Sequence, residues 1–445
     1  MGFPAGCNGA PQSGTVYSGS AVEPFLAIDP TDPAHLIGVW QQDRWSNRGA
    51  NALVAGVSRD GGRTWTRNSA HFSHCSGGSI ANGGDYERTS DPWVTFSPDG
   101  TAYHTSVSFN TSDGGAGNAI LVSRTTDGGL TWDEPIALAR NQSTDVEVDK
   151  ESITADPVDA RLVYAVWDRL EGLDNPNPAS IRGPTWFARF FNGAWEPARP
   201  IYDPGADAQT IANQIAVLPD GTLVNAFLQI DSLSSQLQKR VAVVRSTDKG
   251  VSWSGPIFIE RSLTVGVTDP KNGRPVRSGA IIPGIAADPS SGKLYVVWQD
   301  SRFSSGLRDA IAMSTSIDGG RTWSTPIRVS QSSDVAAFTP AVAVSASGRV
   351  AVTYYDFRPD NPGNPNSLLT SYWLVTSEDA GANWEEIAVA EGFDLRTAPV
   401  AAEGYFVGDY EGLASDGSSF IPFFSAASFP GHSSFTSIYV PSRTQ

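Results

Sequence analysis

The sequence SRDGGRTW occupies residues 58–65, and its pattern, Ser/Thr-x-Asp-x-Gly-x-x-Trp, returns four more times along the chain. The further copies are TTDGGLTW (125–132), STDKGVSW (246–253), SIDGGRTW (316–323) and SEDAGANW (377–384). A degenerate copy, FNGAW (191–195), keeps only the Gly and the Trp. Self-similarity of this kind is the signature of a repeat architecture, so the repeat, and not the length of 445 residues, sets the expected number of domains.

The physical content of the motif is a tight turn. Its Asp side chain accepts backbone N–H bonds, a Gly supplies the left-handed backbone conformation, and the Trp packs beneath the turn. An Asp whose oxygens accept these bonds is not available as an acid or a base. We therefore expect the motif to be structural and to lie away from the functional site.

A second repeat, an apolar strand that ends in a turn, lies upstream of the motifs and occurs more often than they do. Its seven copies begin at Glu23, Asp91, Lys150, Asn213, Ile282, Thr339 and Asp409. Further strand-like runs follow each copy, and Gly, Pro and alternating patterns interrupt every candidate helix. The sequence therefore predicts an all-β fold, a single β-propeller domain over residues 1–445 made of four-stranded blades, with seven blades favoured and six as the alternative.

The seventh unit lacks the Asp motif and holds only three strand-like runs. The N-terminal segment 1–20 includes GTVYSG (14–19), which precedes the first unit and suits a strand. We expect this segment to supply the missing outer strand and so to close the ring.

Charge and cysteine content exclude several classes of protein. The net charge of −16 opposes binding to nucleic acid, and no run of 18 apolar residues is present to span a membrane. The two cysteines, Cys7 and Cys75, are too few for a cysteine-rich zinc site and form either one disulfide or two separate thiols. We expect an exported monomer, although the first ten residues do not read as a signal peptide.

Charged residues stand where the innermost strands of the units begin, on the face opposite the Asp motifs. These residues are Glu23, Asp91, Lys150 and the adjacent trio Asp409, Tyr410 and Glu411. Apolar residues follow immediately, so the charge is specific to the mouth of the central axis. Tyr410 beside two carboxylates is the first catalytic candidate, as nucleophile or proton donor, and the alternative is a hydroxyl that only caps its strand.

Arginines follow the second strand of several units, in WQQDR (40–44), WDR (167–169), WQDSR (298–302) and YYDFR (354–358). Guanidinium groups that converge on an axis would bind the carboxylate of an acidic sugar through paired hydrogen bonds. The expected substrate-binding set is Arg44, Arg88, Arg302, Arg358, Lys150 and Glu23. The alternative is that each arginine pairs with the Asp of its own unit.

The segment 66–89 is too long to be a mere connection between two units. It carries His71 and His74, which we expect to be exposed near the axis and able to carry protons close to neutral pH. His104 alternates with apolar residues in TAYHTS and is expected to be packed.

With these motifs the chain resembles the sialidase superfamily, whose propellers carry such Asp boxes. The resemblance implies an exo-acting glycosidase with three arginines on the sugar carboxylate, a Tyr nucleophile assisted by a Glu, and an Asp as acid–base. By position, Arg44, Arg302 and Arg358 would form the triad, Tyr410 or Tyr355 the nucleophile and Asp91 the proton carrier. The Phe/Tyr-Arg-Ile-Pro sequence of that family is missing, and seven units are counted where the family has six.

Two other functions stay open at this point. Seven units also resemble the propeller lyases that cleave rhamnose–glucuronate linkages by β-elimination, in which His71, His74 or Tyr410 would move the proton. A non-catalytic glycan-binding propeller would tolerate the same arginines. We expect hydrolysis of a terminal acidic sugar from a glycan, with no cofactor and no assigned metal, although axial carboxylates could hold Ca²⁺.

Overall fold

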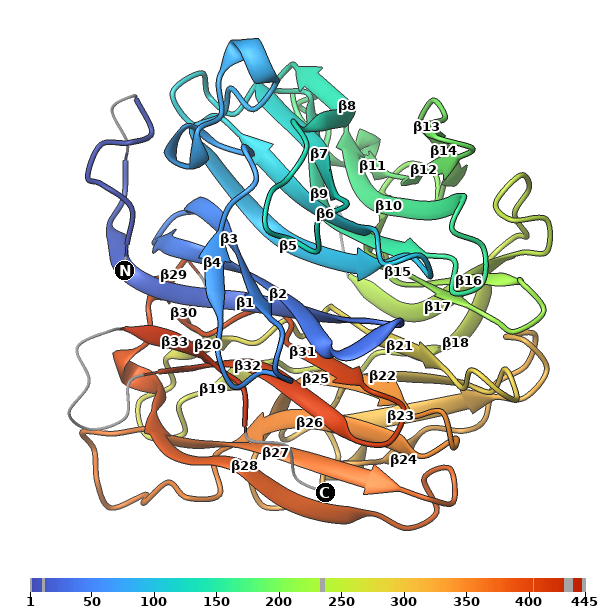
Figure 1. Ribbon diagram of the computed structural model, residues 1–445. Coiled ribbons are helices and arrows are strands. Elements are labelled where there is room, and N and C mark those ends of the chain that lie inside the picture. Colours follow the sequence, from blue (N-terminus) through green and yellow to red (C-terminus); the bar gives the residue numbers. More distant parts are fainter. Residues whose placement is uncertain (1, 10–12, 233–236, 403, 428–434, 442–445) are drawn as a thin grey trace.

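A computed structural model describes residues 2–9, 13–232, 237–402, 404–427 and 435–441 (Figure 1). Over these residues the chain forms 33 strands and five helices of three residues each. The helices are η1 (His74–Ser76), η2 (Ile80–Asn82), η3 (Pro178–Ser180), η4 (Arg302–Ser304) and η5 (Leu395–Thr397). Within the described ranges, no helix has the length and apolar character that crossing a membrane requires. The predicted all-β class is confirmed.

Most strands group along the chain into seven successive antiparallel sets. The first three sets are β1 (Val16–Asp29), β2 (Asp32–Trp45), β3 (Ala50–Ser58) and β4 (Thr66–Asn68); β5 (Arg88–Phe96), β6 (Ala102–Phe109), β7 (Gly117–Thr125) and β8 (Ile136–Gln142); and β9 (Val146–Ala155), β10 (Leu162–Glu171), β12 (Thr185–Phe191) and β14 (Arg199–Tyr202). Two short strands, β11 (Arg182–Gly183) and β13 (Ala194–Trp195), join the third set.

The remaining sets repeat this order. They are β15 (Ala208–Val217), β16 (Leu223–Asp231), β17 (Gln238–Ser246) and β18 (Ile257–Arg261); β21 (Gly284–Ala287), β22 (Leu294–Asp300), β23 (Ala310–Ser316) and β24 (Ile327–Arg328); β25 (Ala337–Val344), β26 (Val350–Asp356), β27 (Leu369–Ser377) and β28 (Glu385–Asp394); and β31 (Gly412–Ser415), β32 (Phe420–Ala427) and β33 (Thr436–Tyr439). The last set has three described strands.

The first strands of the sets lie next to one another. In chain order β1 contacts β5, which contacts β9, and the contacts continue through β15, β21, β25 and β31. β31 in turn contacts β1, so the first and last sets of the chain are neighbours, as the blue and red ribbons show (Figure 1).

The N-terminal segment pairs differently from the expectation that it completes the last set. Val16 and Tyr17 pair with Trp45 and Arg44 of β2, because residues 16–29 form one long strand that keeps a single partner. The last set is held by side chains instead. The Ala21 N–H donates to Thr436 Oγ1 at 3.1 Å, and Ser425 Oγ donates to the Ala21 carbonyl at 2.8 Å.

Five of the seven first strands contain a residue with a left-handed backbone, at Glu23 (φ 52°), Asp91 (53°), Lys150 (48°), Ala212 (60°) and Thr339 (51°). Pairing with the second strand is interrupted at each of these positions. Such β-bulges re-aim side chains, and left-handed non-glycine residues cost about 1–3 kcal/mol each. Backbone strain of this kind is concentrated at functional sites. The bulges therefore mark the region around the first strands as a candidate functional site.

The five Asp motifs form the turns that their sequence predicts. In the first, the Asp60 carboxylate accepts the N–H bonds of Arg63 and Thr64 at 3.0 and 2.9 Å, and the Trp65 indole donates to the Gly62 carbonyl at 2.8 Å. The same carboxylate–amide bonds recur at Asp127, Asp248, Asp318 and Asp379. These carboxylates are therefore engaged in turns.

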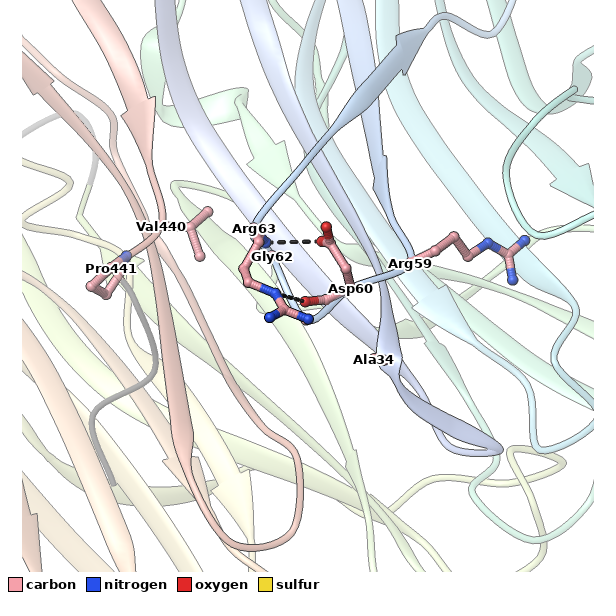
Figure 2. Close-up of a pocket in the computed structure, with 8 residues that line it drawn as sticks. Ala34, Arg59, Asp60, Gly62, Arg63, Val440 and Pro441 are labelled. Atoms are coloured by element: carbon pink, nitrogen blue, oxygen red, sulfur yellow. Dashed lines mark hydrogen bonds between the residues drawn. The ribbon is translucent and has the colours of Figure 1, made fainter.

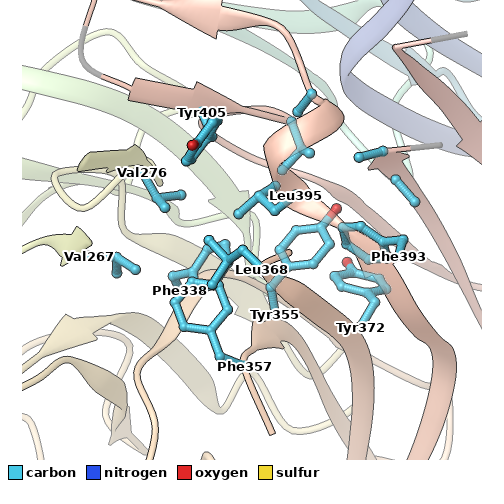
Figure 3. Packing of buried hydrophobic residues seen from close by; sticks show 14 of the residues in the cluster. Val267, Val276, Phe338, Tyr355, Phe357, Leu368, Tyr372, Phe393, Leu395 and Tyr405 are labelled. Atoms are coloured by element: carbon cyan, nitrogen blue, oxygen red, sulfur yellow. The ribbon is translucent and has the colours of Figure 1, made fainter. Parts of the chain in front are cut away.

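Apolar side chains fill the space between neighbouring sets. One cluster joins Tyr355 and Tyr372 of the sixth set to Phe424 of the seventh, with the Tyr372 and Phe424 rings stacked at 4.3 Å between centroids. Figure 3 shows the Tyr355 and Tyr372 rings next to each other in this cluster. The Tyr355 hydroxyl donates to the Ser425 carbonyl at 2.6 Å inside this cluster. Tyr355 is therefore a core residue, away from the position expected of a nucleophile.

A small separate sheet is built from two connections between sets. It comprises β19 (Val267–Thr268), β20 (Pro275–Arg277), β29 (Val400–Ala401) and β30 (Gly404–Phe406). β20 pairs in parallel with β30, which places Arg277 against Phe406, just before Asp409. This sheet brings a side chain from the connection between the fourth and fifth sets to the place where the first strands converge.

Candidate functional site

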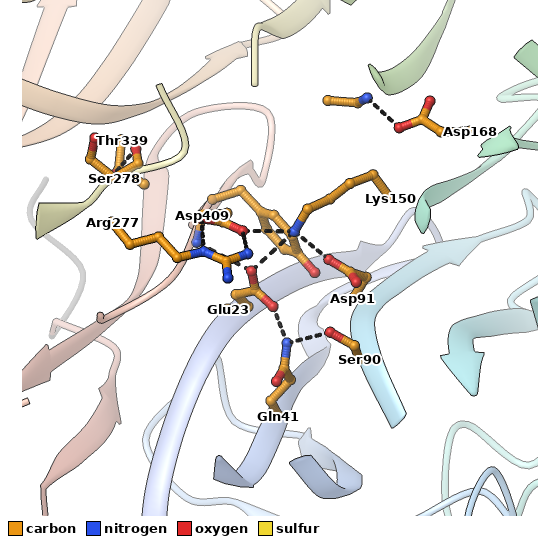
Figure 4. A network of polar contacts seen from close by, with 12 residues as sticks. Glu23, Gln41, Ser90, Asp91, Lys150, Asp168, Arg277, Ser278, Thr339 and Asp409 are labelled. Atoms are coloured by element: carbon orange, nitrogen blue, oxygen red, sulfur yellow. Dashed lines mark hydrogen bonds and ion pairs between the residues drawn. The ribbon is translucent and has the colours of Figure 1, made fainter. Parts of the chain in front are cut away.

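Charged side chains from several sets meet where the bulged first strands converge (Figure 4). The Lys150 ammonium lies 2.5 Å from Asp91 Oδ1, 2.9 Å from Asp409 Oδ2 and 3.2 Å from Glu23 Oε1. Arg277 binds Asp409 through Nε at 2.9 Å and through Nη2. We call these five residues the central cluster. Lys150, Asp91, Asp409 and Glu23 are each at most 9% exposed, so each charge depends on its partners.

The electrostatics of the central cluster follow from burial and pairing. Burial opposes the positive charge of Lys150. The carboxylates of Asp409, Asp91 and Glu23 nevertheless raise the pKa of Lys150 well above its usual value. Burial also opposes ionisation of Asp409, but Arg277 and Lys150 hold the pKa of that carboxyl well below its usual value. Burial raises the pKa of Glu23 to about 7, against the attraction of Lys150.

A cavity of about 290 Å³ opens next to the central cluster, and we call it the central cavity. Its ionisable lining residues are Arg44, Arg48, Asp91, Glu147, Asp149, Lys150 and Arg277. Four cationic and three acidic side chains thus share one hollow. They come from β2, the turn after it, β5, β9 and β20, which are far apart in the sequence.

Asp149 is the carboxyl group of the central cavity best suited to hold a proton. Burial, and after it the charge of Asp91, raises the pKa of Asp149 to about 7. Among the described residues, no hydrogen bond or ion pair reaches its carboxyl group. A half-protonated carboxyl near neutral pH is the property that a general acid requires.

Arg44 presents unused hydrogen-bonding capacity. Its side chain is buried, one Nη donates to Gln41 Oε1 at 3.1 Å, and its Nε has no partner among the described atoms. Burial, together with the nearby Arg277, lowers the pKa of Arg44 to about 10. The Arg44 and Arg277 guanidinium groups both lie over the Phe406 ring, at 4.9 and 4.8 Å from its centroid. Two adjacent guanidinium groups favour an anion between or beside them.

The structure brings together five of the twelve site residues predicted from the sequence. Arg44, Asp91 and Lys150 line the central cavity, and Glu23 and Asp409 belong to the central cluster. The carboxylate of Glu411 is buried and accepts the Ser425 N–H at 2.9 Å; it does not line the cavity.

Tyr410 lies beneath the central cluster and outside the central cavity. Its buried hydroxyl donates to the Pro92 carbonyl at 3.1 Å, and burial raises its pKa well above the usual value. The Lys150 ammonium lies 5.5 Å from the centroid of the Tyr410 ring. This arrangement matches the alternative in which the hydroxyl only caps a strand.

Three of the predicted arginines form local contacts instead of lining the central cavity. Arg302 pairs with Asp300 and Glu260, and Arg358 pairs with Asp356 and Glu386. Arg88 is fully buried, stacks on Trp45 at 4.2 Å and donates to the Arg48 carbonyl at 2.9 Å. The bonds of Arg302 to Asp300 and of Arg358 to Asp356 are the intra-unit pairing that the sequence left open.

The two loop histidines also lie away from the central cavity. His71 binds Glu134 at 2.8 Å and His74 binds Asp85 at 2.9 Å. Their loop is tied to the N-terminal segment by a disulfide between Cys7 and Cys75. His104 is packed as expected: both of its ring nitrogens are buried without a partner among the described atoms. This burial lowers the pKa of His104 to about 3.

Sequence reasoning missed four residues of the central cavity: Arg48, Glu147, Asp149 and Arg277. Glu147 and Asp149 alternate with valines in VEVDK, directly before Lys150, so both carboxyls lie on one side of the strand, and this signal was available. Arg277 lies in a connecting segment, and its position depends on the pairing of β20 with β30, which has no local signature.

A larger hollow of about 710 Å³ lies at the opposite ends of the strands, between the first and last sets (Figure 2). It is lined by Ala34, the turn residues 59–63, and Val440 with Pro441. Among the described residues, Asp60 is the only carboxylate that lines this hollow, and its own turn engages it. The chemistry therefore points to the central cavity despite its smaller size. Over the described ranges, no group of three or more His, Cys, Asp or Glu side chains is placed to hold a metal ion.

No protein-family model and no curated protein sequence matches the chain. Solved structures do resemble it. The α-L-arabinanase of Penicillium chrysogenum, complexed with arabinobiose, is 15% identical, with 77% of this chain and 94% of that chain covered and a TM-score of 0.50. The GH93 α-L-arabinofuranosidase of Fusarium graminearum is 13% identical, with 75% and 88% covered and a TM-score of 0.49.

The Hadza microbial sialidase Hz136 is 17% identical, with 88% of this chain and 70% of that chain covered and a TM-score of 0.48. At such identities, likeness establishes a shared fold and nothing about activity. The arabinanase, with the highest of the three TM-scores, shows that the chain has the fold of a known glycoside hydrolase.

Proposed function

We propose that the protein is a glycoside hydrolase that removes a terminal acidic sugar from a glycan in the central cavity. One observation carries the proposal: a carboxyl with a pKa of about 7, Asp149, shares the cavity with a second carboxyl, Asp91, and four cationic side chains. Glycosidases act through two carboxyl groups with different protonation states, and a carboxylate-bearing sugar requires cations in addition.

The two carboxyl groups would divide the chemistry. Protonated Asp149 would donate its proton to the glycosidic oxygen as the bond to the leaving group breaks. Asp91, which is paired with Lys150, would act as the carboxylate partner, either attacking the sugar carbon or activating a water molecule. Glu147 is paired with Arg48 at the rim of the cavity and would orient substrate hydroxyls.

The acidic nature of the sugar follows from the unused donors. Arg277 is engaged by Asp409, whereas Arg44 keeps an Nε without a partner while lining the cavity. A buried guanidinium with a free donor gains most from an anionic ligand, because the ligand then supplies both charge and hydrogen bonds. Arg44 is therefore the proposed carboxylate anchor, and Arg48 and Lys150, which also line the cavity, add positive charge.

The fold proposal is a seven-bladed propeller. It is supported by seven successive antiparallel sets whose first strands contact one another in order, with the last returning to the first. The arabinanase of similar fold is described with arabinobiose bound, which supports a glycan as the ligand class here. The disulfide supports an exported protein, since such bonds persist in oxidising compartments, and we propose that the chain acts as a monomer without nucleic-acid or membrane partners.

A substrate panel tests the function directly. Methyl sialosides, methyl glucuronides, arabino-oligosaccharides and rhamnose–glucuronate oligosaccharides are incubated with the wild-type protein and with Asp149→Asn, and both reducing sugar and near-ultraviolet absorbance are followed. We expect reducing sugar without new absorbance from an acidic substrate, and loss of release in Asp149→Asn. New absorbance would indicate elimination, and binding without turnover of any substrate would indicate a non-catalytic protein; either result contradicts the proposal.

A further inference from the structure

The degenerate motif of the third set leaves a gap that the intact motifs fill elsewhere. In the second and fourth sets, the turn glycine packs tightly against the preceding set: a methyl group added to Gly129 would meet Ile37 at 2.8 Å, and one added to Gly250 would meet Phe187 at 2.6 Å. Gly193, the glycine of the degenerate motif, has nothing within 4 Å. The short hairpin of β12 and β13 therefore stops before it covers the second set.

A cavity of about 140 Å³ lies in this gap, between β7 and β8 of the second set and the hairpin of the third. Its inner wall is aromatic: the Phe190 ring lies 5.7 Å from Tyr103 and 5.6 Å from Trp195, measured between centroids. Its rim is charged, with Arg124 Nε bound to Asp133 Oδ2 at 3.0 Å. The cavity thus combines apolar ring faces with exposed donors and acceptors.

Polar atoms of the wall lack partners. The Ser123 side chain is 1% exposed, and its Oγ has no hydrogen bond. In the described part of the chain, neither the Tyr103 hydroxyl nor the Trp195 indole N–H has a hydrogen-bond partner either. Burial raises the pKa of Tyr103 to about 12, so this hydroxyl remains a donor over the whole physiological range. Buried polar groups are nearly always paired, so the unpaired Ser123 Oγ, together with two further unbonded donors in the lining of the same cavity, points to a ligand.

We propose that this cavity is a second saccharide-binding site, separate from the central cavity. A sugar ring presents an apolar C–H face and several hydroxyls, which match the Trp195 ring, the unpaired Ser123 and Tyr103 oxygens and the charged rim. That the saccharide belongs to the same glycan as the substrate rests on the proposed function. The site would hold a polymeric glycan on the protein while its end is processed elsewhere.

Affinity electrophoresis tests this proposal in native gels that contain gum arabic or a sialylated mucin, compared with gels that contain neither. We expect at least one polymer to retard the wild-type protein, and Trp195→Ala and Tyr103→Phe to raise the dissociation constant about tenfold or more. Phe191→Ala is the matched control, because Phe191 lies in the same hairpin, is 38% exposed and lines no part of this cavity. It should be retarded like the wild type.

The outcomes separate the two proposals. Turnover of small aryl glycosides, which reports the central cavity, should be unchanged in Trp195→Ala, and its melting temperature is measured to verify folding. If that variant does not fold, Tyr103→Phe, which removes one oxygen, carries the test. Two results would contradict the second site, whether or not the central cavity is active. One is retardation of both variants to the same extent as the wild type, and the other is that neither polymer retards the wild type.

Discussion

Lys150 is the residue on which the central cluster depends. Its ammonium is the shared counter-ion of three carboxylates from three different sets, and its own backbone is left-handed at a bulge. The sequence placed Glu23, Asp91 and Lys150 at equivalent repeat positions, and their convergence follows from the repeat alone. The exact pairing does not, because it depends on bulges that the sequence does not mark.

Replacing Lys150 by Met should destabilise the protein, and more strongly at high pH. The buried carboxyls of Glu23 and Asp91 would lose their counter-ion, whereas Asp409 keeps Arg277, and breaking a buried pair costs about 3–5 kcal/mol. Burial already raises the pKa of Glu23 to about 7, above its unfolded value, and loss of the ammonium removes the attraction that opposes this rise. Stability is therefore retained at low pH and lost as pH rises. Urea unfolding at pH 5 and pH 8 measures this difference.

A suitable control for this prediction is Lys271→Met, since Lys271 is equally buried but pairs with a single carboxylate, Asp360, at 2.7 Å. The destabilisation caused by Lys271→Met should differ less between pH 5 and pH 8 than the destabilisation caused by Lys150→Met. Equal destabilisation of both variants at pH 5 and pH 8 would mean that the central cluster is an ordinary ion pair.

Arg44 allows a second test at the scale of a single residue. Arg44→Gln should raise KM for the acidic substrate about 10- to 100-fold, the cost of a lost charged hydrogen bond, with a smaller change in kcat. A neutral analogue of the same sugar should be affected little. Arg302→Gln, whose guanidinium binds Asp300 and Glu260 outside the cavity, should leave both constants unchanged. An effect of Arg302→Gln as large as that of Arg44→Gln would restore the triad expected from the sequence.

At the scale of elements, the Asp motifs and the connections have opposite roles. The turns of the motifs could be predicted, because the backbone N–H bonds that each Asp carboxylate accepts lie within the motif itself. The small sheet of β20 and β30 could not, since two connections more than 120 residues apart combine to form it and deliver Arg277 to Asp409. The pairing of the N-terminal segment could not be predicted either. Its residues 16 and 17 pair with β2 and not with the last set, because they continue β1, which already pairs with β2.

The turns make a prediction of their own. Hydrogen bonds from Thr131 lower the pKa of Asp127 to about 2, so this carboxylate stabilises the fold above its unfolded pKa of about 4, and the stabilisation is lost as pH falls toward 2. Asp127→Ala should therefore lower the melting temperature by a few degrees at pH 7 and progressively less below pH 4, with turnover unchanged. Differential scanning calorimetry across this range is the measurement. A loss of turnover in the folded variant would contradict a purely structural motif.

At the scale of the whole molecule, the repeat explains both the charge at the centre and its surroundings. Seven first strands converge and supply the central cluster, while the sets around them supply a core such as that of Tyr355, Tyr372 and Phe424. Sequence reasoning found this architecture because it is periodic. It placed Arg302 and Arg358 at the site because residues at equivalent repeat positions were assumed to point alike, and His71 and His74 because their long loop was assumed to reach the axis. Each of these side chains instead binds a nearby carboxylate.

The most direct test of the account is the pH dependence of kcat/KM for the acidic substrate, which reports the ionisations of the free enzyme. Because the pKa of Asp149 is raised to about 7, its acid form predominates below that pH, and kcat/KM should fall as pH rises through about 7. Asp149→Asn should lower kcat/KM by about 10²- to 10⁴-fold and abolish this alkaline limb. A folded Asp149→Asn variant with wild-type kcat/KM and an unchanged alkaline limb would contradict the assignment of Asp149 as the general acid of the central cavity.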